Sequence, residues 1–508
     1  PIERAEHMEL GLQFEDILCY EASPKVVSTH EESLETAIPE YCPDIARIVD
    51  TTGHLSIRER QLAEGRCTVS GSVKVTVLYT SEEAAGLRSL SVSVPFSCVL
   101  DERSLAGCGT ICAQGRVLLA EARAVTSRKL YIKVIPEITI TGYRAVKRRI
   151  ACGTQEESSL RKRCRQIEVD ILAAISEKGF SFTDDLMLES GCVPEDILLH
   201  RMCPVILSAQ RLGNKLMVKG EMQLYALYRD DGQILRQYDA ALPFSQILDV
   251  AELPENAEYA LSPQVDECDI RVTRTDTGTG FGLNARVSVC LMAYQHRTIT
   301  YLEDLYSTCL DTTLERQDIV IPLAKPDSSV QREALIQLEF DRGEPFISVT
   351  SIDCAPAEVF PEEGQVTLRA ALHVRLLYLD ESGAPVSTER TVECSVTVPE
   401  VNGPVSACCC RAVLQFTGGA CRVVLPVTFL IGKTGETSVS GITAVTMTEP
   451  DSDIAARPSL ILCRLGKGET LWDIAKRYHT DADAIRGAIQ LAQDAEAGQH
   501  MLLIPKTR

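Results

Sequence analysis

The stretch that decides the fold is Gly71-Ser-Val-Lys-Val-Thr-Val-Leu-Tyr79, because the chain repeats its pattern twice more. The matching stretches are Gly220-Glu-Met-Gln-Leu-Tyr-Ala-Leu-Tyr228 and Ala370-Ala-Leu-His-Val-Arg-Leu-Leu-Tyr378, about 150 residues apart. In each stretch apolar side chains occupy every second position, and the positions between them are mostly polar. This period of two is typical of a β-strand with one face in a core and the other in water.

Each stretch is followed by a turn and a second strand-like run. The turns lie around Glu83 to Gly86, at Asp230-Asp231-Gly232 and at Asp380 to Gly383, so each stretch begins a β-hairpin. A second apolar pair around another turn follows in each case, within residues 129–140, 271–292 and 412–431. The sequence therefore predicts a mainly β protein with three tandem, related antiparallel β domains.

Segments of different character separate these domains. Residues 154–191 are charged and compatible with a helix or with a link between strands, and residues 315–332 are typical of a connector. The predicted division is an N-terminal segment at 1–35, β domains at 36–153, 192–314 and 333–448, connecting segments at 154–191 and 315–332, a linker at 449–458 and a terminal domain at 459–508.

The terminal domain reads as strand, helix, helix, strand. A short apolar strand spans Ser459 to Leu465, and Thr470 with Asp473 forms a capping box that begins the first helix. A final strand at residues 500–505 completes a small α+β domain. The positions predicted to face its core are Leu471, Ile474, Ala475 and Tyr478 in the first helix and Ala484, Ile485 and Ala488 in a second helix that begins near Asp481.

Two parts of this domain carry a specific resemblance. Gly468-Glu-Thr-Leu-Trp-Asp-Ile-Ala-Lys-Arg-Tyr478 and Gly498-Gln-His-Met-Leu-Leu-Ile-Pro505 together resemble a LysM domain of βααβ form. The resemblance implies binding of N-acetylglucosamine glycans, such as peptidoglycan, between two loops. Docking on a protein stays open as the alternative, because Ala488-Ile-Gln-Leu491 replaces the family's Asn-rich turn. The groove residues carried over are Gly468, Glu469, Thr470 and Leu471 in the first loop and Ile489, Gln490, Leu491 and Gly498 in the second.

The first β domain also resembles a known family. Ile38-Pro-Glu-Tyr-Cys-Pro-Asp-Ile-Ala-Arg-Ile48, Glu64-Gly-Arg-Cys-Thr-Val-Ser-Gly71 and Val94-Pro-Phe-Ser-Cys98 resemble the SPOCS domain of spore-forming Firmicutes. Repeated SPOCS domains before a LysM domain are similar to clostridial spore-coat morphogenetic proteins. The resemblance implies a scaffold in the mother-cell cytoplasm at the forespore surface, whose partners are a spore-coat base-layer protein, peptidoglycan or further copies of itself. A cell-wall-associated peptidoglycan-binding protein is the alternative.

Composition excludes several other classes. Hydrophobic residues make up 45% and charged residues 24% of the chain, which excludes a wholly disordered chain and a multispan membrane protein. The net charge of -20 disfavours a nucleic-acid partner. Residues 1–20 lack the basic and apolar regions of a secretory signal, and no run approaches the roughly 20 apolar residues of a membrane span. We therefore expect no signal, no membrane insertion and no nucleic-acid binding.

No motif in the sequence carries catalytic chemistry. His30-Glu31-Glu32-Ser33-Leu34 lacks the second histidine of a zinc-protease helix, and Gly432-Lys433-Thr434 lacks the earlier glycine of a phosphate loop. We expect no enzyme, no catalytic residue, no cofactor and no metal; an enzyme with an unrecognised site is the alternative. The 20 cysteines lie mostly in apolar runs, which favours buried thiols in a reducing cytosol over a disulfide framework. For the cluster Cys408-Cys409-Cys410 we favour strand packing over metal binding, with later coat cross-linking as a further alternative.

Overall fold

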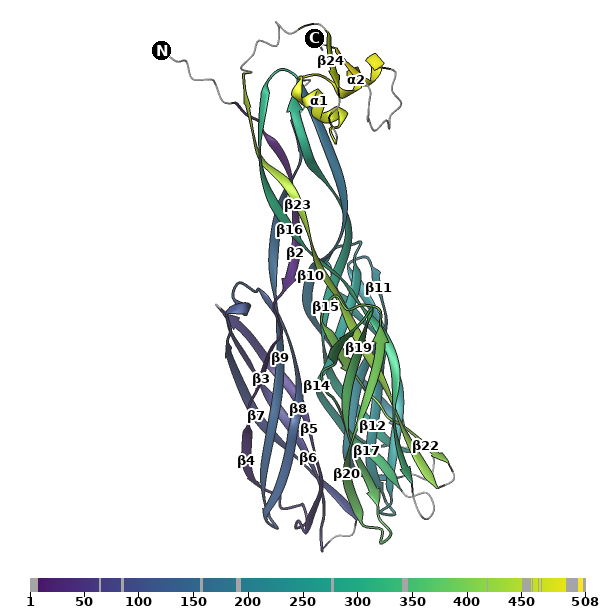
Figure 1. Cartoon of the computed structure of the whole chain (residues 1–508). Helices are drawn as coiled ribbons and strands as arrows, with labels where there is room; N and C mark the ends of the chain where they lie inside the picture. The colour runs from purple at the N-terminus through teal and green to yellow at the C-terminus, as the bar shows by residue number, and fades with distance from the viewer. Residues whose placement is uncertain are drawn as a thin grey trace.

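The chain is mainly β, as the sequence predicts, and its overall shape is elongated (Figure 1). The computed structural model describes residues 8–63, 65–83, 86–155, 159–188, 193–275, 278–339, 346–417, 419–449, 458, 460–464, 466, 468–489 and 501–505. Within these ranges, no helix is long and apolar enough to cross a membrane.

The three repeated stretches form the central strands of three small antiparallel sheets. The strands are β5 (Arg47–Ala63), β6 (Arg66–Thr80), β7 (Leu87–Asp101), β11 (Pro194–Leu212), β12 (Lys215–Asp230), β13 (Leu235–Asp249), β17 (Ile347–Cys354), β18 (Glu358–Glu362), β19 (Gln365–Leu379) and β20 (Pro385–Val398). β6 lies between β5 and β7, β12 between β11 and β13, and β19 between β20 and the pair β17 and β18. The three hairpins therefore form where the sequence predicts them.

The first residue of each repeated stretch shows how the neighbouring strand is accommodated. Gly71 and Gly220 lie beside β-bulges of β5 and β11, and an added Cβ would come within 2.0 Å of the Ser56 carbonyl oxygen and 2.3 Å of the Val205 carbonyl oxygen. Only glycine permits this approach of two backbones. In the third sheet the neighbouring strand is interrupted between β17 and β18, so Ala370 fits there.

Each small sheet packs on a larger sheet, and the two together enclose one hydrophobic core. The larger sheets contain β1 (Met8–Glu9), β2 (Leu12–Ala22), β3 (Val26–Thr29), β4 (Glu32–Ala37), β8 (Thr110–Thr126), β9 (Lys129–Thr154), β10 (Leu160–Met187), β14 (Glu258–Thr275), β15 (Gly278–Ser307), β16 (Asp311–Glu339), β21 (Val405–Cys408), β22 (Val413–Thr417) and β23 (Ala420–Thr448). A short 3-10 helix, η1 (Arg103–Leu105), follows β7.

We name the three bodies by their strands. The first β unit is β3 to β8 with β9 up to Ile140. The second is β11 to β14 with β10 from Ala174 and β15 up to Leu291. The third is β17 to β22 with β16 from Val330 and β23 up to Ile431.

Two segments that the sequence analysis treats as connectors are strands in the structure. Residues 160–187, inside the segment 154–191, form β10, which pairs with β15 along its length. Residues 315–332 lie within β16, which pairs with β23. The alternation of apolar and polar residues in these two strands is hard to see in the sequence. Both strands pass from one hydrophobic core to another, and both carry many charges on the outer face. Pairing with a long neighbour therefore overrides the weak local preference.

The long strands continue past the three β units as a stalk (Figure 1). The pairs β2 with β9, β10 with β15, and β16 with β23 each contribute to its core. This core is mainly aliphatic, because the three antiparallel pairs turn their apolar faces toward one another. Its fully buried members include Ile17, Ile150, Ile171, Ile299 and Ile321.

A separate apolar cluster joins the three β units to one another. Leu78, Leu227 and Leu377 occupy the same position in the three repeated stretches, and all three have 0% exposure. They lie in one cluster with Tyr225 and residues of β7 and β11, and we call this cluster the leucine junction. The tyrosine after each leucine points instead into the core of its own unit. The Leu-Tyr pair at the end of each stretch thus serves two cores at once.

Candidate functional site

The candidate site is the small domain that ends the chain, which we call the terminal module. It consists of β24 (Leu460–Arg464), α1 (Leu471–Arg477), α2 (Ala482–Ile489) and β25 (Met501–Pro505), with β24 and β25 antiparallel. This order is the strand, helix, helix, strand pattern that the sequence predicts. Its core is formed by Ile474, Ala475, Ile485, Leu502 and Ile504, all buried.

The start of α1 is fixed by the predicted capping box. The Thr470 hydroxyl accepts a hydrogen bond from the Asp473 backbone N–H at 3.3 Å, and the Asp473 carboxylate accepts one from the Thr470 N–H at 2.9 Å. The hydrogen bond from that backbone N–H is the largest influence on Asp473, and it holds the pKa of its carboxyl below the usual value. Two of the backbone donors that a helix N-terminus leaves open are satisfied in this way.

The end of α1 turns sharply, and this turn places a histidine on the stalk. Thr480 N–H donates to the Ala475 carbonyl at 3.0 Å, while His479 adopts a left-handed backbone with φ 50°. Glycine usually occupies this position of a helix-ending turn. Here the His479 ring lies against the stalk instead, with Nδ1 3.2 Å from the Ser307 carbonyl oxygen and Nε2 3.0 Å from an Asp311 carboxylate oxygen.

The first predicted groove loop is held by its own side chains. Gly468 has φ 86°, and its missing Cβ faces open space. The Glu469 carboxylate accepts a hydrogen bond from Gly466 N–H at 2.9 Å and pairs with Arg477. Arg477 has the larger effect on the pKa of Glu469, and the two contacts together lower it. Thr470 caps α1, and Leu471 packs against the module core. The structure therefore brings these four predicted residues together, but Glu469 and Thr470 have structural tasks.

The second predicted loop is described only at its beginning. Ile489 is the last residue of α2, whereas Gln490, Leu491 and Gly498 lie outside the described residues. Within α2, Ile485 is buried as predicted, but Ala488 is exposed rather than inward-facing. Among residues 482–488, whose burial the structure describes, Ile485 is the one buried position, because the helix is short and touches the core along one turn.

The single tryptophan of the chain mounts the module on the stalk. The Trp472 ring meets Tyr306 of β15 edge to face, with ring centroids 4.9 Å apart, and the Arg163 guanidinium lies over it at 5.3 Å. Its Nε1–H donates to an Asp304 carboxylate oxygen at 2.7 Å. We call the surface formed by Asp304, Tyr306, Trp472 and Lys476 the seat. In the seat the tryptophan contributes both packing and a hydrogen bond.

Asp304 is the electrostatic centre of the seat. Its side chain is 10% exposed, and its carboxylate also accepts from Lys476 Nζ at 2.7 Å and lies 3.1 Å from an Arg316 nitrogen. Burial opposes ionisation most strongly, but the hydrogen bonds from Lys476 and Trp472 and the charges of Lys476 and Arg316 together outweigh it. The pKa of Asp304 therefore lies below its ordinary value.

Two further contacts complete the mounting. Tyr306 OH donates to the Thr480 carbonyl at 2.8 Å, and burial raises the pKa of this phenol to about 12. Arg161 at the start of β10 pairs with Asp481 at 2.6 Å. The sequence reasoning missed the seat. The one available signal was that Trp472 and Lys476 stand four residues apart, which places both on one face of α1.

Comparison with known proteins gives one family. A family model described as SipL, SPOCS domain, matches residues 44–108. This range covers β5, β6, β7 and η1 of the first β unit. No curated protein and no solved structure matches the chain. The SPOCS resemblance is therefore confirmed for residues 44–108, and it supports a sporulation-related role for this chain.

Proposed function

We propose that this chain is a non-enzymatic spore-coat morphogenetic scaffold that helps to localise the coat around the forespore. In this proposal it works in the mother-cell cytoplasm at the forespore surface. The observation that carries the proposal is the SPOCS match at residues 44–108. The internal repetition of the Leu-Tyr stretch in the second and third β units supports extending the SPOCS assignment to them.

The shape of the molecule supports a spacing role. The leucine junction joins the three β units through one buried cluster, and the long strands lead from the units to the terminal module at the opposite end (Figure 1). A body that presents β units at one end and a recognition module at the other can bridge two layers. Self-association through the exposed edges of the small sheets is part of this proposal.

We assign the terminal module to the LysM family as part of the same proposal. Its βααβ order and its capped first helix support this assignment. The module would dock on a base-layer protein of the coat or on peptidoglycan, through the side that the stalk leaves open. The face of α1 with Trp472 and Lys476 already contacts the stalk, so we place the docking surface at the loops around Gly468.

Imaging in living cells tests the proposal. A fluorescent fusion of the whole chain is expected to form a shell around the forespore in sporulating cells. A matched fusion that ends at Asp453, and so lacks the terminal module, should give a weaker shell. Signal at the wall of vegetative cells would overturn the scaffold and favour the peptidoglycan-binding alternative.

Sedimentation with purified peptidoglycan then separates the two docking modes. The whole chain should pellet with peptidoglycan if the module binds glycan, and the version that ends at Asp453 should stay in solution. A forespore shell in cells without pelleting in the assay would assign the module to a protein partner.

A further inference from the structure

Two disulfides connect the β units. The cysteine pattern of the sequence favours buried free thiols and does not predict these two bonds. Cys112 of β8 in the first unit is bonded to Cys290 of β15 in the second, with their Cα atoms 6.8 Å apart. Cys203 of β11 in the second unit is bonded to Cys410 of the third, with a Cα separation of 5.8 Å. Each bond crosses from a strand or loop of one β unit to another unit. The two bonds together link all three units.

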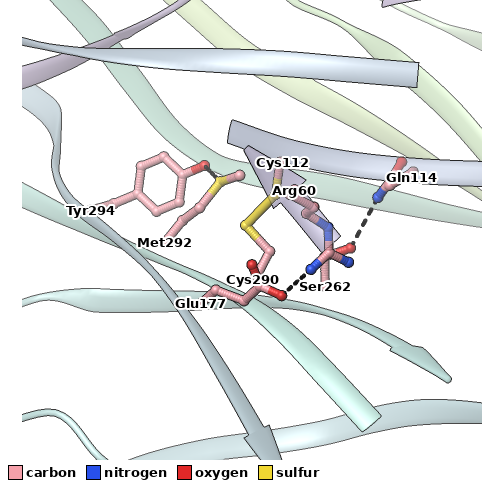
Figure 2. The surroundings of a disulfide bond; sticks show 8 residues. All are labelled: Arg60, Cys112, Gln114, Glu177, Ser262, Cys290, Met292 and Tyr294. Carbon is pink, nitrogen blue, oxygen red and sulfur yellow. Dashed lines mark hydrogen bonds and ion pairs between the residues drawn. A yellow bond between two sulfur atoms is a disulfide. The ribbon is translucent and has the colours of Figure 1, made fainter. Parts of the chain in front are cut away.

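The first disulfide lies at a polar seam between the first and second units (Figure 2). On one side of it Gln114 Nε2 donates to Ser262 Oγ at 3.3 Å, and Arg60 pairs with Glu177. Gln114 and Arg60 belong to the first unit. Ser262 of β14 and Glu177 of β10 belong to the second. On the other side of the bond lie Tyr294 and Met292, which belong to an apolar cluster that Cys112 also contacts (Figure 2), so the seam combines polar and apolar contacts with one covalent bond.

A cavity opens beside this disulfide. It has a volume of about 280 Å³, and both Cys112 and Cys290 line it. Arg60, Gln114, Ser262 and Ser288 contribute charged and polar groups to the same cavity. Apolar groups of Ile111, Ile175 and Pro263 line the rest of it, and a cavity of this size suits a small molecule rather than a folded protein. Attack on a disulfide requires a thiolate to reach one of its sulfur atoms, and this cavity provides such access.

The second disulfide has different surroundings. The third unit, which contains Cys410, has four further cysteines that lie close enough together to influence one another's ionisation. They are Cys354, Cys394, Cys408 and Cys409. Burial raises the pKa of Cys354 to about 12 and of Cys409 to about 11, so both stay protonated near neutral pH. A protonated thiol does not attack a disulfide. Internal exchange between this bond and either of these two thiols is therefore slow near neutral pH.

We propose that the Cys112–Cys290 disulfide is a reducible clasp between the first and second β units, and that the cavity beside it admits a small thiol as the reductant. The Cys203–Cys410 bond, which joins the second and third units, is the internal comparison for its rate of reduction.

The chemistry of the clasp is ordinary exchange. The thiolate of the small thiol attacks one protein sulfur, forming a mixed disulfide and releasing the other protein sulfur as a thiolate. A second small thiol then displaces the first protein sulfur. Overall, one protein disulfide and two small thiols give two protein thiols and one small disulfide. The reverse sequence, with a small disulfide as oxidant, closes the clasp.

The test uses the full chain and two reagents for free thiols. Protein is alkylated without reductant, exposed to reduced glutathione for increasing times, and alkylated again with an isotopically heavier reagent before peptide mass spectrometry. We expect linked peptides 112 with 290 and 203 with 410 at the start, and reduction of the first pair about tenfold faster. Free thiols at Cys112 and Cys290 after oxidation with glutathione disulfide, or faster loss of the second pair, would overturn the proposal.

A substitution in the cavity wall tests the access route. Gln264 of β14 lines the cavity and takes no part in the seam contacts named above, so Gln264→Phe should narrow the cavity without removing one of them. We expect it to slow reduction of Cys112–Cys290 several-fold. Ser395→Phe, at an exposed position of β20, is the matched control and should leave the rate unchanged. Equal rates in the two variants would show that glutathione does not approach through this cavity.

Hydrogen exchange tests whether the bond acts as a clasp. In Cys112→Ser, and equally in reduced wild type, amides of β8 and β14 at the seam should exchange faster than in oxidised wild type. Cys164→Ser removes an exposed free thiol and is the control. A seam whose exchange is the same in oxidised protein, reduced protein and Cys112→Ser would contradict the clasp.

Discussion

The leucine junction and the seat both join parts of the molecule, but they use opposite physical means. The junction is built from leucines of three units that have no contact with water, with Leu78, Leu227 and Leu377 in equivalent positions. The seat is built around one carboxylate, Asp304, which receives hydrogen bonds from Trp472 and Lys476. The first joint depends on burial of apolar area, and the second depends on charge.

This difference sets how each joint responds to its surroundings. Burial of aliphatic side chains is insensitive to pH and is strengthened by salts that are excluded from protein surfaces. A charged hydrogen-bonded centre weakens when its carboxylate is neutralised or when salt screens its partners. We therefore expect the three β units to stay joined under conditions that release the terminal module.

The largest effect should come from the junction. Leu227→Ala removes a side chain with 0% exposure from the contact of all three units and should reduce the free energy of unfolding by about 4 kcal/mol. Ile247→Ala removes an aliphatic side chain that is 63% exposed and should change it by less than about 0.5 kcal/mol. Urea unfolding followed by circular dichroism measures both. Similar losses in the two variants would contradict the role of the junction.

The next largest effect should come from the seat. Asp304→Ala leaves Trp472 Nε1 and the Lys476 ammonium without their shared acceptor and should weaken the mounting of the module by about 3 kcal/mol. Because Trp472 is the only tryptophan, its emission should shift to longer wavelength as water reaches the ring. Asp318→Ala, an exposed position of the same strand as Arg316, serves as the control. An unchanged emission spectrum in Asp304→Ala would remove Asp304 from the centre of the seat.

Acid should produce a smaller version of the same change. The pKa of Asp304 in the folded protein is lowered, so its contribution is complete above the ordinary carboxyl pKa near 4 and is lost as the pH falls through the lowered value. Asp481 is lowered as well: burial opposes its ionisation, but the Asp483 backbone N–H and Arg161 outweigh that effect. Wild-type Trp472 emission should therefore shift to longer wavelength below about pH 4. The same titration of Asp304→Asn, which cannot lose this charge, should show a smaller transition, and an identical transition would assign it to other groups.

The smallest effect should come from the cap of α1. Thr470→Ala removes the hydroxyl that accepts from Asp473 N–H and should lower the stability of the module by about 1 kcal/mol. Thr470→Ser keeps that hydroxyl and should be nearly neutral. Thermal unfolding monitored by Trp472 emission measures both. If the two variants pellet with peptidoglycan as well as wild type does while differing in stability, Thr470 serves the fold of the loop. Both variants lack the threonine methyl group, so an equal loss of pelleting in both would place that methyl group in the groove.

The parts of the fold that follow local rules could be predicted from the sequence. The period of two in Gly71 to Tyr79 gave the central strands, and Thr470 with Asp473 gave the start of α1, because both patterns act within a few residues. The same alternation, however, assigns Leu78 to the mostly polar face of the strand, which the sequence predicts to face water. The sequence offers no sign that this face meets two other units.

The parts that depend on distant contacts could not be predicted. β10 looked like a connector because its partner β15 begins about a hundred residues later in the chain, and the pairing decides its conformation. Asp304, one acidic residue among many, gains its importance only from Trp472 and Lys476 on another element. Cys112 and Cys290 are 178 residues apart, and nothing in their local sequence suggests that they meet.

One strand, β15, carries a mechanical consequence. It places Phe281 in the core of the second unit, Ile299 in the stalk and Tyr306 in the seat, without a break in the chain. Its hydrogen bonds to β10 run nearly at right angles to the strand direction. Tension between the terminal module and the body is therefore shared by many of these bonds in shear, rather than opening them one at a time. A molecule built in this way resists being pulled lengthwise far better than being peeled apart.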